Sequence, residues 1–261
     1  MDRYSTYRHL SFDRHDGVLT VILNAPGPMN VTDAVLHAEL ATVFDTIRGD
    51  DLVDAVVLTG AGEAFSGGAD LRWLVETTPT ERDRVFVEAR TIIIDLLELP
   101  QPIIAAIEGP AVGLGATMAL FCDFKVAAAD ARIGDLHTRV GMVAGDGGAV
   151  IWPWLIGAGR AKWYLMTGDS LAAADAERLG LIDEVVPHGN ALERARVLAA
   201  RLAGGHRDAI RGTKASVNKL LRDAANLVLD TSLSLEKESL ASETCRTSLR
   251  AALAKAYASS S

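Results

Sequence analysis

Cysteine is scarce in this sequence, and no stretch of it is apolar enough to suggest a membrane crossing. Only two cysteines, Cys122 and Cys245, occur among 261 residues, and no metal-ligand or redox spacing links them. A chain of this length can bury a large core without disulfides, which predicts a protein of a reducing compartment. The first ten residues are polar and lack the apolar core of a secretory signal. We therefore expect a cytoplasmic protein with no membrane-spanning segment.

An excess of positive charge is also missing. The formal net charge is −8 at pH 7. Nucleic acids and anionic membranes are bound through clusters of Lys and Arg, so the composition argues against both as partners. An anionic ligand would have to be met by a few local groups.

The most informative stretch runs from Pro102 to Asp123. A short apolar run ends at Gly109-Pro110, which is typical of a buried strand closed by a turn. Glycines 113 and 115 then lead into a segment too uniformly apolar for a surface helix. The first amides of a helix have no partner within it and favour a negative oxygen. The stretch therefore predicts a strand, a glycine turn and a buried helix, with the turn serving either as an oxyanion site or only for close packing.

A second glycine turn, Phe65 to Leu71, follows an apolar strand expected at 54–59. Gly67 and Gly68 permit a close approach of the backbone, and Asp70 can cap the helix that follows. Two turns of the same kind thus require an explanation.

Strand and helix patterns alternate along the chain as far as Pro187. Further strands are expected at 18–23, 125–129, 132–134 and 181–186, and helices at 33–48, 81–99, 160–166, 172–179 and 191–203. Strand signals stop after Pro187, and the remainder is expected to be mainly helical. Repeated strand–turn–helix units without a nucleotide fingerprint favour a stacked α/β spiral over a Rossmann sheet.

The segment from Asp135 to Gly148 is an irregular, glycine-punctuated loop that holds His137 and Asp146. An imidazole with a pKa of about 6.5 suits general base work, and a carboxylate beside it orients the ring and stabilises its cation. The plainer interpretations are that Asp146 caps a helix beginning at Gly147 or Gly148 and that His137 is an ordinary loop histidine.

Four segments of the chain follow one another in an order that is typical of one family. They are Phe65–Leu71, Ile104–Gly115, Thr167-Gly168 and Gly180–Val186. Together they resemble the crotonase, or enoyl-CoA hydratase/isomerase, superfamily. The resemblance implies a ββα spiral core over residues 1–200 and a helical trimerisation region over 201–261. It also implies a homotrimer or dimer of trimers, with fatty acid metabolism as its setting.

The resemblance further implies a site that binds an acyl-CoA substrate. Two backbone N–H groups, assigned to Gly67 and Leu114, would hold an enolate-like thioester oxygen, and each such donor typically lowers the barrier by about 3 kcal/mol. Coenzyme A would enter as part of the substrate, with no tightly bound cofactor and no metal. The residues expected along it are Met29, Asn30, Ser66, Ala69, Asp70, Leu71 and Arg72.

The acid–base groups depart from those of the family's hydratases, which use two glutamates. The matching positions hold Thr117 and His137, and threonine cannot take up a proton at neutral pH. Asp146 is the candidate for the missing carboxylate, and Glu238 is a more remote one. We therefore expect a lyase or isomerase of the enoyl-CoA hydratase/isomerase type, with His137 and Asp146 moving protons.

Two alternatives stay open at this point. His137 and the turn at 145–147 also resemble crotonases that cleave β-diketones or β-ketoacyl substrates by a retro-Claisen reaction. That branch interrupts the second glycine turn, whereas residues 112–115 keep the acyl-CoA form. The alternative of another class is a noncatalytic CoA-binding or scaffold protein, which Thr117 would allow.

Overall fold

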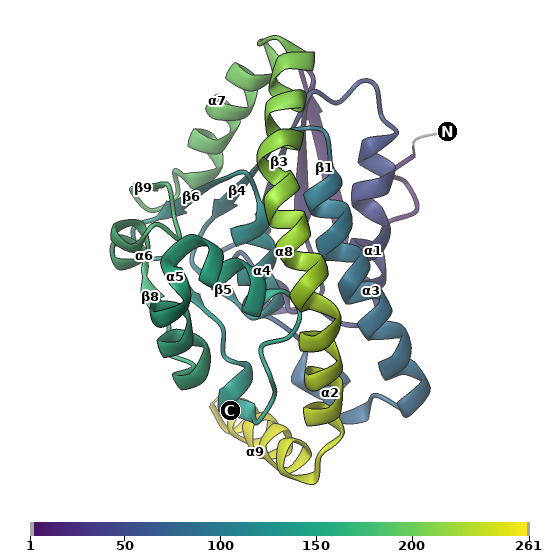
Figure 1. Ribbon diagram of the computed structural model, residues 1–261. Coiled ribbons are helices and arrows are strands. Elements are labelled where there is room, and N and C mark those ends of the chain that lie inside the picture. The colour runs from purple at the N-terminus through teal and green to yellow at the C-terminus, as the bar shows by residue number, and fades with distance from the viewer. Residues whose placement is uncertain (1–2, 260–261) are drawn as a thin grey trace.

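The strands of the computed structural model, which describes residues 3–259, form two sheets (Figure 1). The larger sheet has six strands in the order β1-β2-β3-β4-β6-β9, which is also their order in the chain. They are β1 (Leu10–His15), β2 (Val18–Leu23), β3 (Ala55–Gly60), β4 (Ile103–Ile107), β6 (Phe124–Ala128) and β9 (Glu184–Val186). Only the β1–β2 pair of this sheet is antiparallel. The smaller sheet joins β5 (Pro110–Val112), β7 (Arg132–Gly134) and β8 (Leu171–Ala172).

Helices connect the strands and cover the larger sheet. They are α1 (Ala34–Arg48), α2 (Leu71–Glu76), α3 (Pro79–Glu98), α4 (Leu114–Phe121), α5 (Gly148–Thr167), α6 (Ala173–Leu179), α7 (Ala191–Ala203), α8 (Arg207–Ala241) and α9 (Glu243–Ser259), with 3-10 turns η1 (Pro28–Asn30) and η2 (His137–Val140). Helix α7 packs on β3 and β4, whereas α1 packs on α3 and α3 packs on α8. Figure 1 shows α8 running beside α3 and leading to α9, which lies near α2. The predicted α/β spiral with a helical C-terminal part is confirmed.

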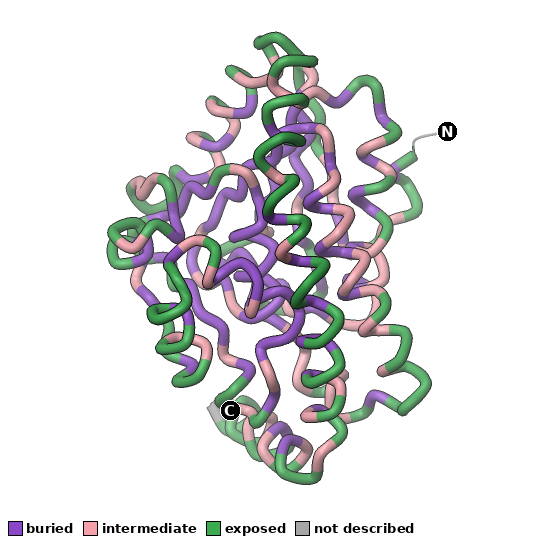
Figure 2. Tube along the Cα trace, viewed as in Figure 1, coloured by how far each residue is buried: buried purple, intermediate pink, exposed green. Residues whose placement is uncertain are grey.

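The core follows the apolar strands that the sequence predicted. Strand β4 is buried along its whole length, and helix α4 is buried at every position. Figure 2 shows this buried interior behind the exposed outer turns of α8. Parallel strands covered on both faces lose water from both sides, which explains their continuous apolar runs. No helix within residues 3–259 combines the length and apolarity that a membrane crossing requires.

The helix starts are set by local side chains. The Asp33 carboxylate accepts hydrogen bonds from the amides of Val35 and Leu36, and Asp70 caps α2 in the same way. Strands β1, β5 and β8 were not predicted from the sequence, and β9 is shorter than the strand expected at 181–186. Strand β1 was missed because it is an edge strand whose outer half is polar and exposed. Helix α5 consists of two helical stretches that meet at Gly157, whose φ of 78° and ψ of 153° are not helical, so the helix expected to begin at Gly147 or Gly148 and the one expected at 160–166 are both present.

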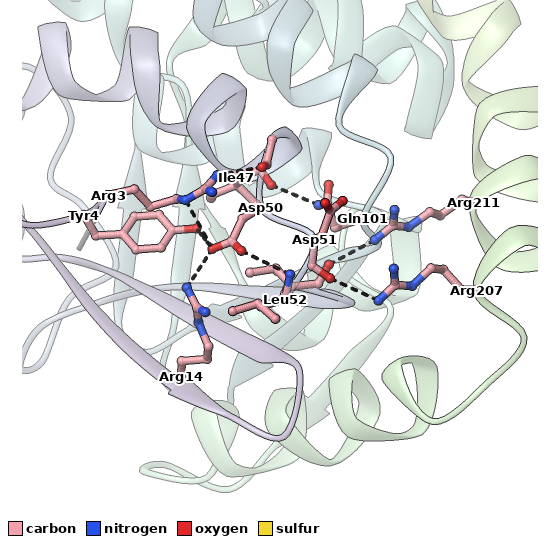
Figure 3. A network of polar contacts seen from close by, with 12 residues as sticks. Arg3, Tyr4, Arg14, Ile47, Asp50, Asp51, Leu52, Gln101, Arg207 and Arg211 are labelled. Carbon is pink, nitrogen blue, oxygen red and sulfur yellow. Dashed lines mark hydrogen bonds and ion pairs between the residues drawn. The ribbon is translucent and has the colours of Figure 1, made fainter. Parts of the chain in front are cut away.

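A buried carboxylate ties the N-terminal segment to the end of α1 (Figure 3). Asp50 is 2% exposed, and its Oδ2 lies 2.9 Å from the Tyr4 hydroxyl and 2.6 Å from an Arg14 nitrogen. Burial alone would raise the pKa of Asp50, but the hydrogen bonds from Tyr4 and from the amide of Leu52, with the Arg14 charge, outweigh it and lower that pKa. The ionised carboxylate is therefore the form that stabilises the fold.

Substitution Asp50→Asn should lower the free energy of unfolding by about 1–3 kcal/mol, because it weakens a buried charged hydrogen-bond network. A carboxylate with a depressed pKa contributes stability above its unfolded pKa of about 3.9, and this contribution is lost as the pH falls further. Urea denaturation should thus show a difference at pH 7 that shrinks below about pH 4. Asp51→Asn is the control, because the hydrogen bond from Arg207 goes to the backbone oxygen of Asp51. An equal loss in both variants would contradict this account.

Candidate active site

The two glycine turns lie side by side and are joined by backbone hydrogen bonds. The amide of Val112 donates to the Ser66 oxygen at 2.9 Å, and the amides of Phe65 and Ser66 donate to Pro110 at 3.0 and 3.1 Å. This approach requires glycine at position 115, where a Cβ would lie 2.6 Å from Ser66 Cβ. The predicted meeting of the two turns is therefore present in the structure.

The direction of the amides corrects one prediction. The Gly67 N–H donates to the Met29 oxygen at 2.6 Å, so it is already engaged within the backbone. Among residues 3–259, no hydrogen-bond acceptor meets the amide of Ala69 or that of Leu114, the first residue of α4. Both residues line the same small chamber. The free donor in the first loop is thus Ala69 rather than Gly67.

His137 begins the 3-10 turn η2 and is held by a carboxylate that immediately precedes this turn. Oδ1 of Asp135 lies 2.7 Å from Nδ1 and 3.2 Å from the backbone nitrogen of His137. The other ring nitrogen, Nε2, lies 3.6 Å from Oδ2 of Asp146 and 3.8 Å from Oε1 of Glu236. These two distances exceed a direct hydrogen bond and leave room for a reacting group or water to bridge them.

The charges of this cluster favour shared protons. Burial alone would lower the pKa of His137, yet the carboxylates of Asp135 and Asp146 outweigh it and hold that pKa well above its usual value. Burial raises the pKa of Asp146, although the imidazolium beside it acts in the opposite direction. Burial also raises the pKa of Glu236 well above its usual value, and repulsion from Asp146 adds to the rise. The cluster therefore places proton donors and acceptors around one imidazole nitrogen.

Thr117 supports this cluster by a hydrogen bond and supplies no acid–base group to it. Its hydroxyl donates to Oδ1 of Asp146 at 3.2 Å, and the residue is fully buried. The loop that carries Asp146 is clamped to α8 where the Ser232 hydroxyl donates to the Gly145 oxygen at 2.7 Å. A Cβ at Gly145 would lie 2.7 Å from Cβ of Glu236, so only glycine lets α8 approach this closely.

Two members of the cluster were not predicted from the sequence. Asp135 is fully buried and Glu236 is 6% exposed, whereas Glu238, the glutamate singled out on α8, is exposed. The signal for Glu236 was its helical spacing with Leu233 and Leu240, which places it on the buried face of α8. Asp135 belongs to no recognisable sequence motif, and its role is inferred only from its contact with His137.

Two cavities meet at His137. The inner chamber has a volume of about 50 Å³, and its walls include Ala69, Leu114, His137, Asp146 and Glu236. The outer cavity of about 440 Å³ is lined by the first glycine turn, by η2 and by Leu253 and Ala256 of α9. A larger cavity of about 720 Å³ lies between α5 and the first half of α8, and none of the cluster residues lines it.

The residues expected along coenzyme A have mixed positions. Ala69, Asp70 and Leu71 line the outer cavity, and Met29 is 40% exposed. Asn30 is different, because its side-chain amide is buried and donates to the oxygens of Ala61 and Ala64.

Ser66 and Arg72 are also engaged within the protein. The Ser66 hydroxyl is buried and donates to the Asn30 oxygen at 3.0 Å. The side chains of Asn30 and Ser66 therefore hold the loops, so any contact of these two residues with coenzyme A would have to use their backbone. The Arg72 guanidinium donates to the Tyr257 hydroxyl and lies 5.5 Å from the centre of that ring, which links α2 to α9.

The cluster also offers ligand atoms that could surround a cation. The nearest ligand atoms of Asp135, His137 and Asp146 lie within 4.8 Å of one another. The direct bond to Asp135 uses Nδ1, however, so the ring has only Nε2 to offer to any further group. The same atoms are arranged equally well for proton transfer.

A family model described as enoyl-CoA hydratase/isomerase matches residues 13–257. The chain belongs to the enoyl-CoA hydratase/isomerase family. This confirms the resemblance inferred from the four segments.

Individual members of this family show a range of activities. The crotonyl-CoA hydratase of Syntrophomonas wolfei is 30% identical over 215 residues, which are 82% of each chain. An enoyl-CoA hydratase/isomerase from Mycobacterium paratuberculosis superposes with a TM-score of 0.90 at 31% identity, covering 93% of this chain and 97% of the other. A β-diketone hydrolase from Anabaena sp. PCC 7120, bound to (S)-3-oxocyclohexyl acetic acid, superposes with a TM-score of 0.85 at 28% identity, covering 96% and 98%. Membership therefore indicates an enzyme of this family and leaves the reaction to the site.

Proposed function

We propose that this chain is an acyl-CoA enzyme that adds water at C3 of an enoyl thioester. The observation that carries the proposal is that Ala69 and Leu114, whose backbone amides meet no acceptor within residues 3–259, line the same chamber as the His137 cluster. Amides in a water-excluded site stabilise a developing oxyanion, and each is typically worth about 3 kcal/mol. The imidazole and carboxyl groups then lie where protons must enter and leave.

The proton steps can be assigned to the cluster. Water attacks C3 and gives a proton to the His137–Asp146 pair, which titrates as a unit. The thioester becomes an enolate, and its oxygen is held by the amides of Ala69 and Leu114. C2 then takes a proton from Glu236, since the raised pKa of this carboxyl favours its protonated form. Return of the first proton to Glu236 completes the cycle, so one water is added and no charge remains.

Cleavage of a C–C bond is the second candidate, and it is favoured by the likeness to the β-diketone hydrolase. In that reaction, water activated by the same pair attacks a C3 carbonyl. The C2–C3 bond breaks, the electron pair moves into the enolate held by the amides, and C2 takes the proton from Glu236. The replacement of a carboxylate by Thr117 suits both reactions, because Thr117 only positions Asp146.

Mass spectrometry of reactions in ¹⁸O-labelled water separates the candidates. Crotonyl-CoA should yield 3-hydroxybutyryl-CoA that carries one ¹⁸O atom. Labelled acetate from acetoacetyl-CoA, or acid formed from a CoA-free 1,3-diketone, would replace hydration with C–C hydrolysis. Binding of acyl-CoA without turnover of any of these compounds would instead support the noncatalytic alternative.

Assembly into trimers or pairs of trimers is part of the proposal, as is a cytoplasmic location. Support for assembly comes from large apolar side chains on the outer faces of α5 and α8. They include Trp154, Trp163, Met166, Leu220 and Leu227, which are 46–82% exposed. Apolar surface on this scale is typical of protein–protein contact.

A further inference from the structure

His37 lines the inner chamber, and no hydrogen bond or ion pair within residues 3–259 joins it to the cluster around His137, although it lies close enough to Asp146 to act electrostatically against the raised pKa of that carboxyl. It lies in the first turn of α1 and is only 3% exposed. A buried histidine can serve as a packing element between helices, or it can present one ring nitrogen to a ligand. The hydrogen bonds of its two nitrogens separate these roles.

One nitrogen of His37 is committed to the protein. Nδ1 lies 2.8 Å from Oε2 of Glu88 on α3, and the other oxygen of Glu88 lies 3.3 Å from Arg84. A carboxylate accepts hydrogen bonds, so Nδ1 carries the hydrogen and the ring is fixed in orientation. Within residues 3–259, no side chain or backbone group bonds to Nε2. That nitrogen is therefore the polar atom that His37 has left for a ligand.

A second polar atom of the same chamber also lacks a partner. Thr32 is 1% exposed and lines the chamber, and its hydroxyl has no hydrogen bond within the described part of the chain. The chamber also holds the His137 cluster, and the apolar part of its wall includes Trp73, Leu74, Val85, Phe86, Ala89 and Leu240. The Trp73 ring centre lies 5.5 Å from that of His37. Polar groups in such a wall cost free energy unless a bound group meets them.

We propose that the natural acyl group carries an oxygen function, either a hydroxyl or a carbonyl, beyond C3, and that His37 selects it together with Thr32. This rests on the proposed function, in which the acyl group enters the inner chamber. Nε2 accepts from a hydroxyl in the neutral ring and donates to a carbonyl in the protonated ring. The chamber of about 50 Å³ holds a group of the size of a few water molecules, which fits a compact polar substituent.

Calorimetric binding of saturated acyl-CoAs tests this without requiring turnover. The ligands share a hexanoyl chain and carry an oxo, hydroxy or methyl group, which is placed in turn at C4, C5 and C6. Wild-type protein should prefer one oxygenated ligand over its methyl counterpart by about 10- to 100-fold, the cost of an unmet buried polar group. The oxo and hydroxy compounds identify which oxygen function is bound.

The variants assign that preference to His37. His37→Phe should abolish it, and His37→Gln, whose amide reaches the position of Nε2, should restore part of it. Thr32→Val should reduce it to a smaller extent, and it tests the same chamber if His37→Phe does not fold. His188→Phe is the control, because His188 is exposed and pairs with Asp130 outside the chamber.

Two results would overturn the inference. Equal wild-type affinity for oxygenated and methyl ligands is one. Equal weakening of both ligand classes by His37→Phe is the other, and it would make His37 only a contact between α1 and α3. A retained oxygen preference in a protein that turns over none of the thioesters would support the inference and refute the proposed reaction.

Discussion

His137→Ala is expected to lower kcat/KM for crotonyl-CoA by about 10²- to 10⁴-fold, the usual contribution of a positioned acid–base group. The imidazole is the one group that touches all three carboxylates of the cluster, at 2.7 Å from Asp135, 3.6 Å from Asp146 and 3.8 Å from Glu236. Its removal leaves three buried carboxyl groups without a cation. Steady-state kinetics on the purified variant measure the effect.

The dependence of kcat/KM on pH tests the same assignment. The proposed base is the His137–Asp146 pair, and the pKa of each member is raised. The acidic limb of kcat/KM for wild-type protein should therefore lie above about pH 4, where an ordinary aspartate would titrate. Asp146→Asn should remove that limb along with most of the activity.

His188→Ala is the control for His137→Ala, because His188 is also a histidine but lies outside the chamber. Near-wild-type kinetics in His137→Ala would exclude His137 from the chemistry.

Leu114→Pro should lower kcat by about 10²- to 10³-fold, as expected when one oxyanion donor is lost. Leu114 is the first residue of α4, after Gly113 with φ of 54°. Proline is well accepted at the first position of a helix, where its missing N–H costs no helical hydrogen bond. The substitution thus removes the amide while α4 is retained.

Leu114→Ala is the matched control, because it shortens the side chain but keeps the N–H. It should retain activity within about 10-fold, with the effect mainly on KM, since the amide that acts in the transition state is still present. Circular dichroism and thermal denaturation establish that both variants fold. If the two variants lost the same activity, the leucine side chain and not its amide would be the group that matters.

Local patterns were sufficient to predict the parts of the site that lie within one segment. The glycines at 67, 68, 113 and 115 marked both turns, and the loop at 135–148 marked His137 and Asp146. Helix caps such as Asp33 were predictable for the same reason, because a cap and the amides that it bonds are neighbours in the sequence. The family resemblance then predicted the spiral fold in which these segments come together.

Features that depend on pairing between distant segments could not be predicted in the same way. The Gly67 amide is engaged because Met29 lies beside it, and the Asn30 amide is buried because the chain at 61–64 folds over it. Glu236 was missed although its spacing on α8 was visible, because nothing in the sequence shows that α8 lies against Gly145. The sequence pattern identifies which face of a helix is buried, and tertiary packing decides what that face meets.

The clamp between Ser232 and Gly145 has a consequence for how the enzyme matures. Glu236, the proton donor in the proposed mechanism, reaches the chamber from the second half of α8, so a nascent chain contains both glycine turns and the loop at 135–148 before Glu236 has been synthesised. Local unfolding of α8 in the folded protein would likewise remove Glu236 from the chamber while the two glycine turns stayed folded. In the proposed mechanism, catalytic competence thus depends on the docking of α8, and amide hydrogen exchange along α8 reports directly on that docking.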